Sequence, residues 1–315
     1  MPSSAPPANP ASADLITVRD LLRYGVTAFT RAGLVYGHGT ATALDEAAFL
    51  ILSALHLPID ALDPWLDARL TVPERTQILA LFARRIETRK PAAYLVNAAY
   101  IQGHRFYVDE RVIVPRSYIG ELICQDGLAA LIPAPENVTS VLDMCTGSGC
   151  LAILAALAFP QALVDAADIS AGALAVARRN VEDYGLSSRV TLHAGDLFAA
   201  LPGASRYDLI IANPPYVARA EVAAFSPEYR AEPVLAHVGG EDGLDLVRKI
   251  IDGAGQFLAP GGMLVVEIGT GREGLEASYP AFDFLWLDTA TSEGEVVAIA
   301  AKSLTAKPRA SRAVR

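Results

Sequence analysis

Four consecutive residues, Asn213-Pro214-Pro215-Tyr216, can together hold a planar amino group. They follow a short apolar segment that predicts a strand, and two prolines in a row cannot continue a strand ladder, so they form a rigid turn. The side-chain oxygen of Asn213 and the carbonyl oxygen of Pro214 can accept both hydrogens of an NH2 group. The ring of Tyr216 then offers a flat face for stacking. A proline turn without a chemical role is the alternative interpretation.

A glycine-rich turn stands earlier in the chain, in Asp143-Met-Cys-Thr-Gly147-Ser-Gly149. Two glycines between a strand and a helix let a ligand approach the backbone closely, and the spacing loosely matches the dinucleotide-binding fingerprint. Asp168 ends the next predicted strand, where a carboxylate can accept both hydroxyl groups of a ribose. These residues alone do not distinguish a nicotinamide enzyme from one that uses S-adenosylmethionine.

The carboxylate of Asp143 favours S-adenosylmethionine. Just before the glycines it would repel a pyrophosphate, whereas it would attract the amino group of a methionine moiety and add negative potential near a sulfonium. A second acid, Asp196, follows the third predicted strand. It can meet the edge of an adenine, with Leu197 against the face of the ring, or it can cap a helix.

The two segments together predict methyl transfer to an amide or an arylamine. The nitrogen lone pair of either group is delocalised into its π-system, so the nitrogen is a poor nucleophile. Two acceptors aimed at the NH2 hydrogens favour a pyramidal nitrogen and stabilise the positive charge that develops on transfer. No strong base is required, because a methylated amide nitrogen is very acidic before it loses its proton. Holding nitrogen, methyl and sulfur in line can contribute about 7–11 kcal/mol.

These segments resemble the class I S-adenosylmethionine-dependent methyltransferases of the HemK/Prm type, which methylate glutamine side-chain amides in proteins. The resemblance rests on VLDMCTGSG, the acidic end of the second strand, GDLF and NPPY, and it spans about Leu15 to Ala301. It implies an α/β fold: a Rossmann-like sheet of seven strands, the last antiparallel, with a small N-terminal helical domain and a β-hairpin linker. It places the cofactor, S-adenosylmethionine, against Asp143, Thr146, Gly147, Gly149, Asp168, Leu197 and Asn213, and the glutamine against the catalytic and substrate-binding residues Asn213, Pro214, Pro215 and Tyr216.

The segment before the glycine turn indicates a branch of this family. The chain reads YVDERVIVPRS from Tyr107 to Ser117, followed by IGEL, which resembles the branch that acts on large-subunit ribosomal protein three (PrmB-like). Release-factor methyltransferases carry an IPRP-type segment instead. Tyr118 replaces a proline that is usual in the branch, and Cys145 stands where many class I enzymes have glycine, although cysteine is usual here.

Arg116 and Glu121 lie in this branch-specific segment. They are expected either to contact the substrate loop or to form a salt bridge that fixes the hinge. The expected partner is the ribosomal protein, with a contact to ribosomal RNA or to assembly intermediates as a further possibility.

Other functions stay open at this stage. Release-factor methylation is one alternative, and nucleic-acid adenine methylation is another, because NPPY turns also hold the amino group of adenine. A nicotinamide oxidoreductase would have no use for the proline turn, and a non-catalytic scaffold that folds on the ribosome would not need Asn213. The five histidines show no HExxH or similar spacing, and Cys145 and Cys150 do not form a CxxC pair, so no metal is expected.

Composition excludes several classes of protein. The chain has 315 residues, of which 52% are hydrophobic and 19% charged, so it can build a core of about two domains. Three cysteines exclude a disulfide scaffold and fit the reducing cytoplasm. The apolar run Leu151–Phe159 is too short to span a membrane, and the start lacks the features of a secretory signal. A formal charge of −9 argues against bulk electrostatic binding of nucleic acid.

Changes in pattern predict the domain boundaries. Residues 1–14 are expected to form a disordered tail, and residues 15–93 a helical domain. The resemblance implies that this helical domain recognises the substrate. Residues 94–117 are rich in aromatic and β-branched side chains around a glycine and predict a hairpin linker. Residues 118–303 alternate strands and helices, which is typical of a parallel sheet covered on both faces and gives the methyltransferase domain. Residues 304–315 form a basic tail.

The expected strands and helices can be placed by number. Strands are expected at 138–144, 162–168, 190–193, 208–212, 263–268, 284–287 and 295–301, and helices of the sheet domain at 150–159, 171–184 and 243–257. In the helical domain, Arg84, Arg85, Arg89 and Lys90 make one helix end basic. A solvated helix end is the simpler interpretation, and a contact for an acidic partner is the alternative.

Overall fold

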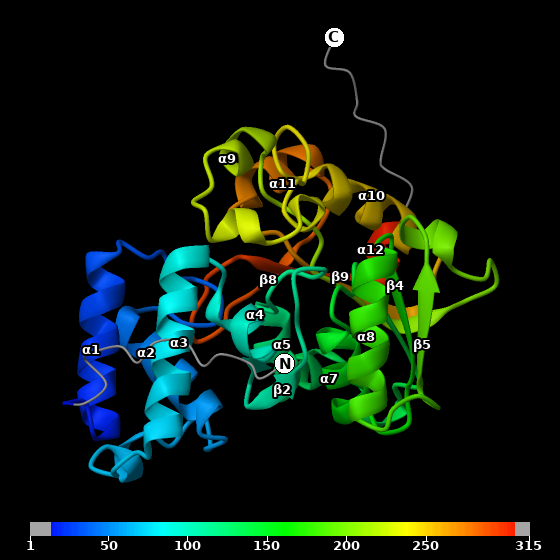
Figure 1. Cartoon of the computed structure of the whole chain (residues 1–315). Coiled ribbons are helices and arrows are strands. Elements are labelled where there is room, and N and C mark those ends of the chain that lie inside the picture. The colour runs from blue at the N-terminus through cyan, green and yellow to red at the C-terminus, as the bar shows by residue number, and fades with distance from the viewer. Residues whose placement is uncertain (1–13, 306–315) are drawn as a thin grey trace. The chain divides into compact units, whose positions relative to one another are not determined.

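A computed structural model describes residues 14–305, which form two compact units (Figure 1). The helical unit comprises residues 14–98 and the short segment 226–231. The sheet unit comprises residues 99–225 and 232–305. The tails predicted at 1–14 and 304–315 lie outside the described residues, apart from Asp14, Leu304 and Thr305.

The helical unit is built from amphipathic helices. Its α-helices are α1 (Val18–Arg31), α2 (Ala43–Ala54), α3 (Val72–Thr88) and α4 (Ala92–Val96). Thr17 begins α1 and Thr71 begins α3, each through a capping box in which side chain and backbone exchange hydrogen bonds. The apolar faces meet in one core, where the rings of Phe29 and Phe82 lie 5.1 Å apart at an edge-to-face angle.

A buried ion cluster connects α2, α3 and the segment 226–231. Arg85 has no solvent-exposed surface, and its Nε donates to Glu46 over 2.7 Å. Nη1 of Arg85 lies 3.7 Å from the buried carboxylate of Glu228, which also pairs with Arg89 at 2.8 Å. The simpler interpretation of this basic helix end as solvated is therefore wrong for Arg85, because carboxylates from two distant parts of the chain surround its guanidinium.

We predict that Arg85→Met lowers the free energy of unfolding by about 3–5 kcal/mol, because it leaves the buried carboxylate of Glu46 without its cation and leaves Glu228 with Arg89 alone. The exposed neighbour Arg84 provides a matched control, and Arg84→Met should change the free energy by no more than about 0.5 kcal/mol. Denaturant unfolding of both variants measures the difference. Equal stability of the two variants would contradict a structural role for the cluster.

The sheet unit begins with a two-stranded hairpin. β1 (Ala99–Ile101) and β2 (His104–Phe106) pair antiparallel around a two-residue turn. The hairpin is shorter than the predicted range 94–117, because Pro91 begins the short helix α4 and Tyr94 is buried on that helix. The aromatic and β-branched composition of the range therefore identified a hairpin but placed its start too early.

The main sheet has seven strands in the order β5-β4-β3-β6-β7-β9-β8. They are β3 (Ser140–Met144), β4 (Leu163–Asp168), β5 (Val190–Ala194), β6 (Tyr207–Ala212), β7 (Leu258–Glu267), β8 (Leu285–Leu287) and β9 (Val296–Ala300). β9 pairs antiparallel with both of its neighbours, and the other pairs are parallel. The predicted Rossmann-like sheet with an antiparallel last strand is confirmed. β7 begins five residues before the predicted strand at 263–268.

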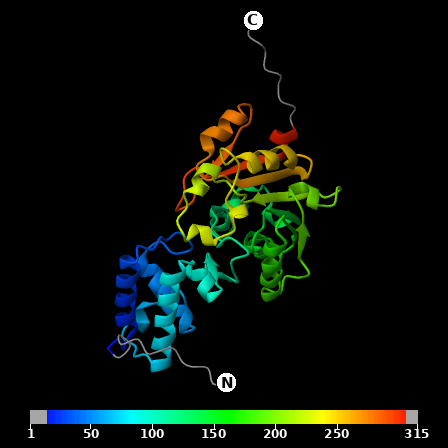
Figure 2. The ribbon, with the colours of Figure 1, turned by 45° about the horizontal axis from the view of Figure 1, so that its top comes forward.

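Helices cover both faces of this sheet (Figures 1 and 2). α7 (Cys150–Ala158) and α8 (Ala171–Asp183) pack on one face, and α10 (Asp245–Ala254) packs on the other. Val141 points into one core and Leu142 into the other, because successive strand residues face opposite sides. The remaining α-helices are α5 (Tyr118–Cys124), α6 (Gly127–Leu131), α9 (Arg219–Ala223), α11 (Arg272–Ser278) and α12 (Ala301–Thr305).

The strand order reverses between β3 and β6. In open parallel sheets, ligands bind outside the carboxyl ends of the strands at such a switch point. Met144 and Ala212 are paired in register, so the glycine turn and the NPPY turn begin side by side. Among residues 14–305, no helix is both long enough and apolar enough to cross a membrane.

Candidate active site

Asp143 is a buried acid at the end of β3. Its Oδ2 accepts hydrogen bonds from Thr146 Oγ1 at 2.5 Å and from the backbone N–H of Ala152 at 3.0 Å. Its Oδ1 is buried and has no hydrogen-bond partner among residues 14–305. Burial raises the pKa of this carboxyl to about 7. A free acceptor oxygen in this position fits a cationic ligand group, as expected for the amino group of S-adenosylmethionine.

The glycine turn uses left-handed backbone at three positions. Cys145, Gly147 and Gly149 have φ values of 62°, 56° and 79°. A Cβ on Gly147 would meet no protein atom within 4 Å, so space beside this residue is open for a ligand. A Cβ on Gly149 would lie 3.1 Å from Cβ of Ala177 on α8, so this glycine permits close packing of the helix. The φ of Cys145 also explains why glycine is common at its position.

Asp168 faces the same turn from the end of β4. One oxygen accepts from the backbone N–H of Gly147 at 2.8 Å, and the other accepts from Ser170 N at 2.8 Å. Burial raises the pKa of the Asp168 carboxyl. Each carboxylate oxygen has a second lone pair, so the two bonds orient the group and leave capacity to accept ribose hydroxyls.

Asp196 and Leu197 follow β5, as predicted. The side chain of Asp196 is exposed and makes no capping hydrogen bond to the short helix after it. The helix-cap alternative is therefore not realised. Leu197 is half-buried and has a φ of 48°, which is unusual for a residue with a branched side chain. Its role beside a bound adenine stays a prediction.

Two side chains of the NPPY turn, those of Asn213 and Tyr216, are held by hydrogen bonds. Asn213 Nδ2 donates to the backbone carbonyl of Arg116 at 3.2 Å. This bond fixes the orientation of the side-chain amide, and Oδ1 has no hydrogen-bond partner among the described residues. Tyr216 Oη donates to Glu267 Oε1 at 3.1 Å. The side-chain amide of Asn213 is thus held at its nitrogen, and the ring of Tyr216 is held at its hydroxyl group.

Glycines after the turn let a second segment pack against its backbone. A Cβ on Gly239 would lie 2.6 Å from the carbonyl oxygen of Pro215, and a Cβ on Gly243 would overlap the carbonyl oxygen of Tyr216. Val217 N donates to His237 O at 2.9 Å. The segment 237–243 therefore supports the turn directly.

Arg116 forms a salt bridge, but its partner is Glu232 and not Glu121. Two of its guanidinium nitrogens each donate to Glu232 at 2.8 Å, and Glu232 also accepts from the backbone N–H of Val114 at 2.8 Å. The carboxylate of Glu232 is fully buried. This pair fixes the backbone whose carbonyl orients Asn213, so Arg116 contributes to the site through its main chain.

Glu121 is buried on α5 and lies against the loop before β9. It accepts from Ala290 N at 2.7 Å and from Thr291 Oγ1 at 3.3 Å. These bonds anchor a loop and are not a salt bridge, so the hinge salt bridge proposed for this residue is not formed. A contact of Glu121 with a substrate stays a prediction.

Glu267 is the site residue that sequence reasoning missed. It ends β7 and is 1% exposed. Ser117 Oγ donates to its Oε2 at 2.6 Å, and Tyr118 N donates to the same oxygen at 3.0 Å. The signal was available, because a single acid that ends an apolar strand at the carboxyl edge repeats the pattern of Asp143 and Asp168. Tyr118 is the first residue of α5, a position that also suits proline.

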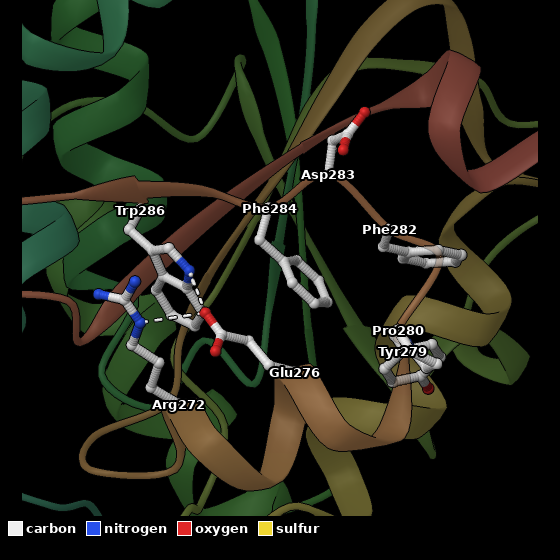
Figure 3. Close-up of a pocket in the computed structure, with 8 residues that line it drawn as sticks. All are labelled: Arg272, Glu276, Tyr279, Pro280, Phe282, Asp283, Phe284 and Trp286. Carbon is white, nitrogen blue, oxygen red and sulfur yellow. Dashed lines mark hydrogen bonds and ion pairs between the residues drawn. The ribbon is translucent and has the colours of Figure 1, made fainter.

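A separate aromatic pocket of about 450 Å³ lies between α11 and β8 (Figure 3). Arg272 stacks on the ring of Trp286 at 4.6 Å, and Glu276 binds both side chains. The pocket contains none of the residues predicted for the site. The other residues that line it are Tyr279, Pro280, Phe282, Asp283 and Phe284.

Part of the sheet unit matches a known protein family. The family described as "Methyltransferase small domain" matches residues 126–226. With the order of the seven strands and the acids at the switch point, this match defines a class I S-adenosylmethionine-dependent methyltransferase. The predicted fold class and enzyme class are confirmed.

Curated relatives identify the family. The ribosomal protein uL3 glutamine methyltransferase of Burkholderia pseudomallei is 54% identical over 92% of this chain and 96% of its own length. That of Bradyrhizobium diazoefficiens is 56% identical over 92% of each chain, and that of Bordetella pertussis is 53% identical over 92% of this chain and 97% of its own. The chain belongs to the ribosomal protein uL3 glutamine methyltransferase family, as the resemblance implied.

We predict that Gly243→Ala destabilises the chain more than Gly261→Ala does. Both glycines have φ near 80°, so both variants share a backbone cost of about 1–2 kcal/mol. A Cβ at position 261 meets nothing within 4 Å, whereas one at 243 overlaps the NPPY backbone and should cost about 1–3 kcal/mol more. Denaturant unfolding measures both changes. Equal losses would show that Gly243 does not support the turn.

Proposed function

We propose that this chain transfers a methyl group from S-adenosylmethionine to the side-chain amide nitrogen of a glutamine in ribosomal protein uL3, the large-subunit ribosomal protein three. The observation that carries the proposal is the bond from Asn213 Nδ2 to the Arg116 carbonyl, which leaves Oδ1 as an acceptor. The names of relatives that are 53–56% identical support the substrate.

The residues of the turn act on the amide without a base. Asn213 Oδ1 and the Pro214 carbonyl each accept one amide hydrogen, which favours a pyramidal nitrogen and stabilises its developing positive charge. Pro215 keeps the turn rigid, and the ring of Tyr216 supports the flat face of the amide. The rate gain that positioning of this kind can supply is about 7–11 kcal/mol.

The glycine turn holds the methyl donor in this proposal. S-adenosylmethionine supplies an electrophilic methyl group on a sulfonium. Asp143 Oδ1 accepts from the amino group of the donor, and Asp168 accepts from its ribose hydroxyls. The backbone beside the donor is formed by Thr146, Gly147 and Gly149. The other residues proposed to bind the cofactor are Asp196, Leu197 and Asn213.

The proposed partners follow from the same segments. The proposal keeps Arg116 and Glu121 as contacts for the substrate loop. Contact with ribosomal RNA or an assembly intermediate belongs to the proposal as well, and the compartment is the cytoplasm. The cysteines Cys124, Cys145 and Cys150 are all free thiols, which supports a reducing compartment.

The proposal is tested with isolated uL3, release factor and ribosomal RNA, each incubated with the chain and S-adenosylmethionine carrying a labelled methyl group. We expect label on a glutamine amide of uL3, located by mass spectrometry of its peptides. Label on the release factor or on adenine of the RNA would assign the substrate to one of the alternatives. A chain that methylates none of the three would contradict the proposal.

We predict that Asn213→Ala mainly lowers turnover, whereas Asp168→Ala mainly weakens cofactor binding. Asn213→Ala should lower kcat by about 100-fold or more, which is far more than it lowers cofactor affinity, because it removes an acceptor used in the transition state. Asp168→Ala should weaken the affinity by about 10- to 100-fold, because charged hydrogen bonds are lost. Single-turnover kinetics and titration calorimetry measure the two effects. Equal losses of both quantities in Asn213→Ala would refute its assignment.

We predict that Asp143 releases a proton when the methyl donor binds. Burial raises its pKa to about 7 in the folded chain, above about 3.9 in the unfolded chain. Between these values the folded state binds more protons, so this group lowers stability as the pH rises from about 4 to about 7. The cationic donor favours the carboxylate, so binding at about pH 6 should release protons and should tighten as the pH rises.

Titration calorimetry in two buffers with different ionisation enthalpies measures the number of protons released. Asp143→Asn is the matched control, since it keeps the size of the side chain and cannot ionise. Its binding should release fewer protons than that of the unmodified chain. Release that is the same in both proteins would exclude Asp143 as the source.

A further inference from the structure

Glu267 is a buried carboxylate on which three donors converge. Tyr216 Oη donates to Oε1, and Ser117 Oγ and Tyr118 N donate to Oε2. Among residues 14–305, no lysine, arginine or histidine forms an ion pair with it. The pKa of Glu267 is raised to about 7 by burial, which is the cost of placing an acid here with hydrogen bonds alone.

The residues that Glu267 binds affect both side chains of the NPPY turn, the ring of Tyr216 and the amide of Asn213. Tyr216 provides the ring that is proposed to support the face of the glutamine amide. Ser117 follows Arg116, whose carbonyl orients the amide of Asn213. Ser117 also begins α5, because its Oγ accepts from Ile119 N at 3.2 Å. Glu267 therefore stands at the point where the turn and the segment that orients its asparagine are joined.

We propose that Glu267 is a positioning residue that holds the ring of Tyr216 and the backbone around Ser117 in the arrangement that accepts the glutamine amide. This inference deepens the proposed function and rests on it. Glu267 contacts neither substrate nor cofactor in this account. Glu267 holds the ring of Tyr216 at its hydroxyl and also holds Ser117, the neighbour of the carbonyl that binds Asn213. The ring and the asparagine therefore cannot shift independently.

A carboxylate suits this task better than an amide. Both oxygens of Glu267 accept, and the backbone N–H of Tyr118 can only donate. In Glu267→Gln, one of the two positions becomes an NH2 group, which either loses the bond from Tyr118 N or requires the hydroxyl of Tyr216 to accept instead of donate. The variant keeps the shape of the side chain while it weakens the anchor.

The test is a double-mutant cycle of Glu267→Gln and Tyr216→Phe, with kcat and KM for uL3 and the cofactor dissociation constant measured for each protein. We expect each single variant to lose about 10- to 100-fold in kcat, because small misplacements of reacting groups carry losses of this size. Cofactor affinity should change less than twofold. The double variant should lose less than the product of the two single losses, because both changes weaken the anchor of the Tyr216 ring at Glu267.

Tyr279→Phe is the matched control. Its hydroxyl donates to Asp252 at 2.9 Å in the aromatic pocket region and lies outside the proposed site, so kcat should not change. If Glu267→Gln fails to fold, Tyr216→Phe carries the test, because it removes the same bond from the other side. Unchanged kcat in the folded variants, or losses that simply multiply in the double variant, would overturn the positioning role. No turnover of uL3 by the unmodified chain would instead overturn the proposed function on which it rests.

Discussion

The hydrogen bond from Asn213 to the carbonyl of Arg116 decides what the site can accept. A side-chain amide has one acceptor oxygen and one donor group, so fixing the donor fixes the direction of the acceptor. The bond is maintained by the pair that Arg116 forms with the buried carboxylate of Glu232. The NPPY turn is rigid on its own, but only this contact gives its asparagine a defined chemical face.

Buried and half-buried acids at the carboxyl edge of the sheet set the electrostatic character of the site. Asp143, Asp168 and Glu267 end β3, β4 or β7 or lie within one residue of the end. Burial raises the pKa of each, which shows that the fold bears a cost for them. Negative potential near a sulfonium stabilises the ground state of the donor, so the arrangement favours binding, while the acceptors on the turn favour transfer.

The sequence predicts the sheet well because helices cover both of its faces, so its strands appear as short apolar runs. It also predicts the glycine turn and NPPY, since both are local patterns next to a strand end. Contacts between distant residues are different. Arg85 looks like part of a solvated basic helix end, and only folding brings Glu46 and Glu228 to it. The same limit applies to Glu267, whose bonds to Tyr216 and Ser117 join segments far apart in the chain.

The central claim concerns the two oxygen atoms that receive the substrate amide. A crystal structure of the chain with S-adenosylhomocysteine and a glutamine peptide of uL3 measures it directly. The account predicts that the amide nitrogen lies about 2.7–3.2 Å from both Asn213 Oδ1 and the carbonyl oxygen of Pro214. A peptide whose amide nitrogen points away from these two oxygens, or whose carbonyl occupies their place, would contradict it.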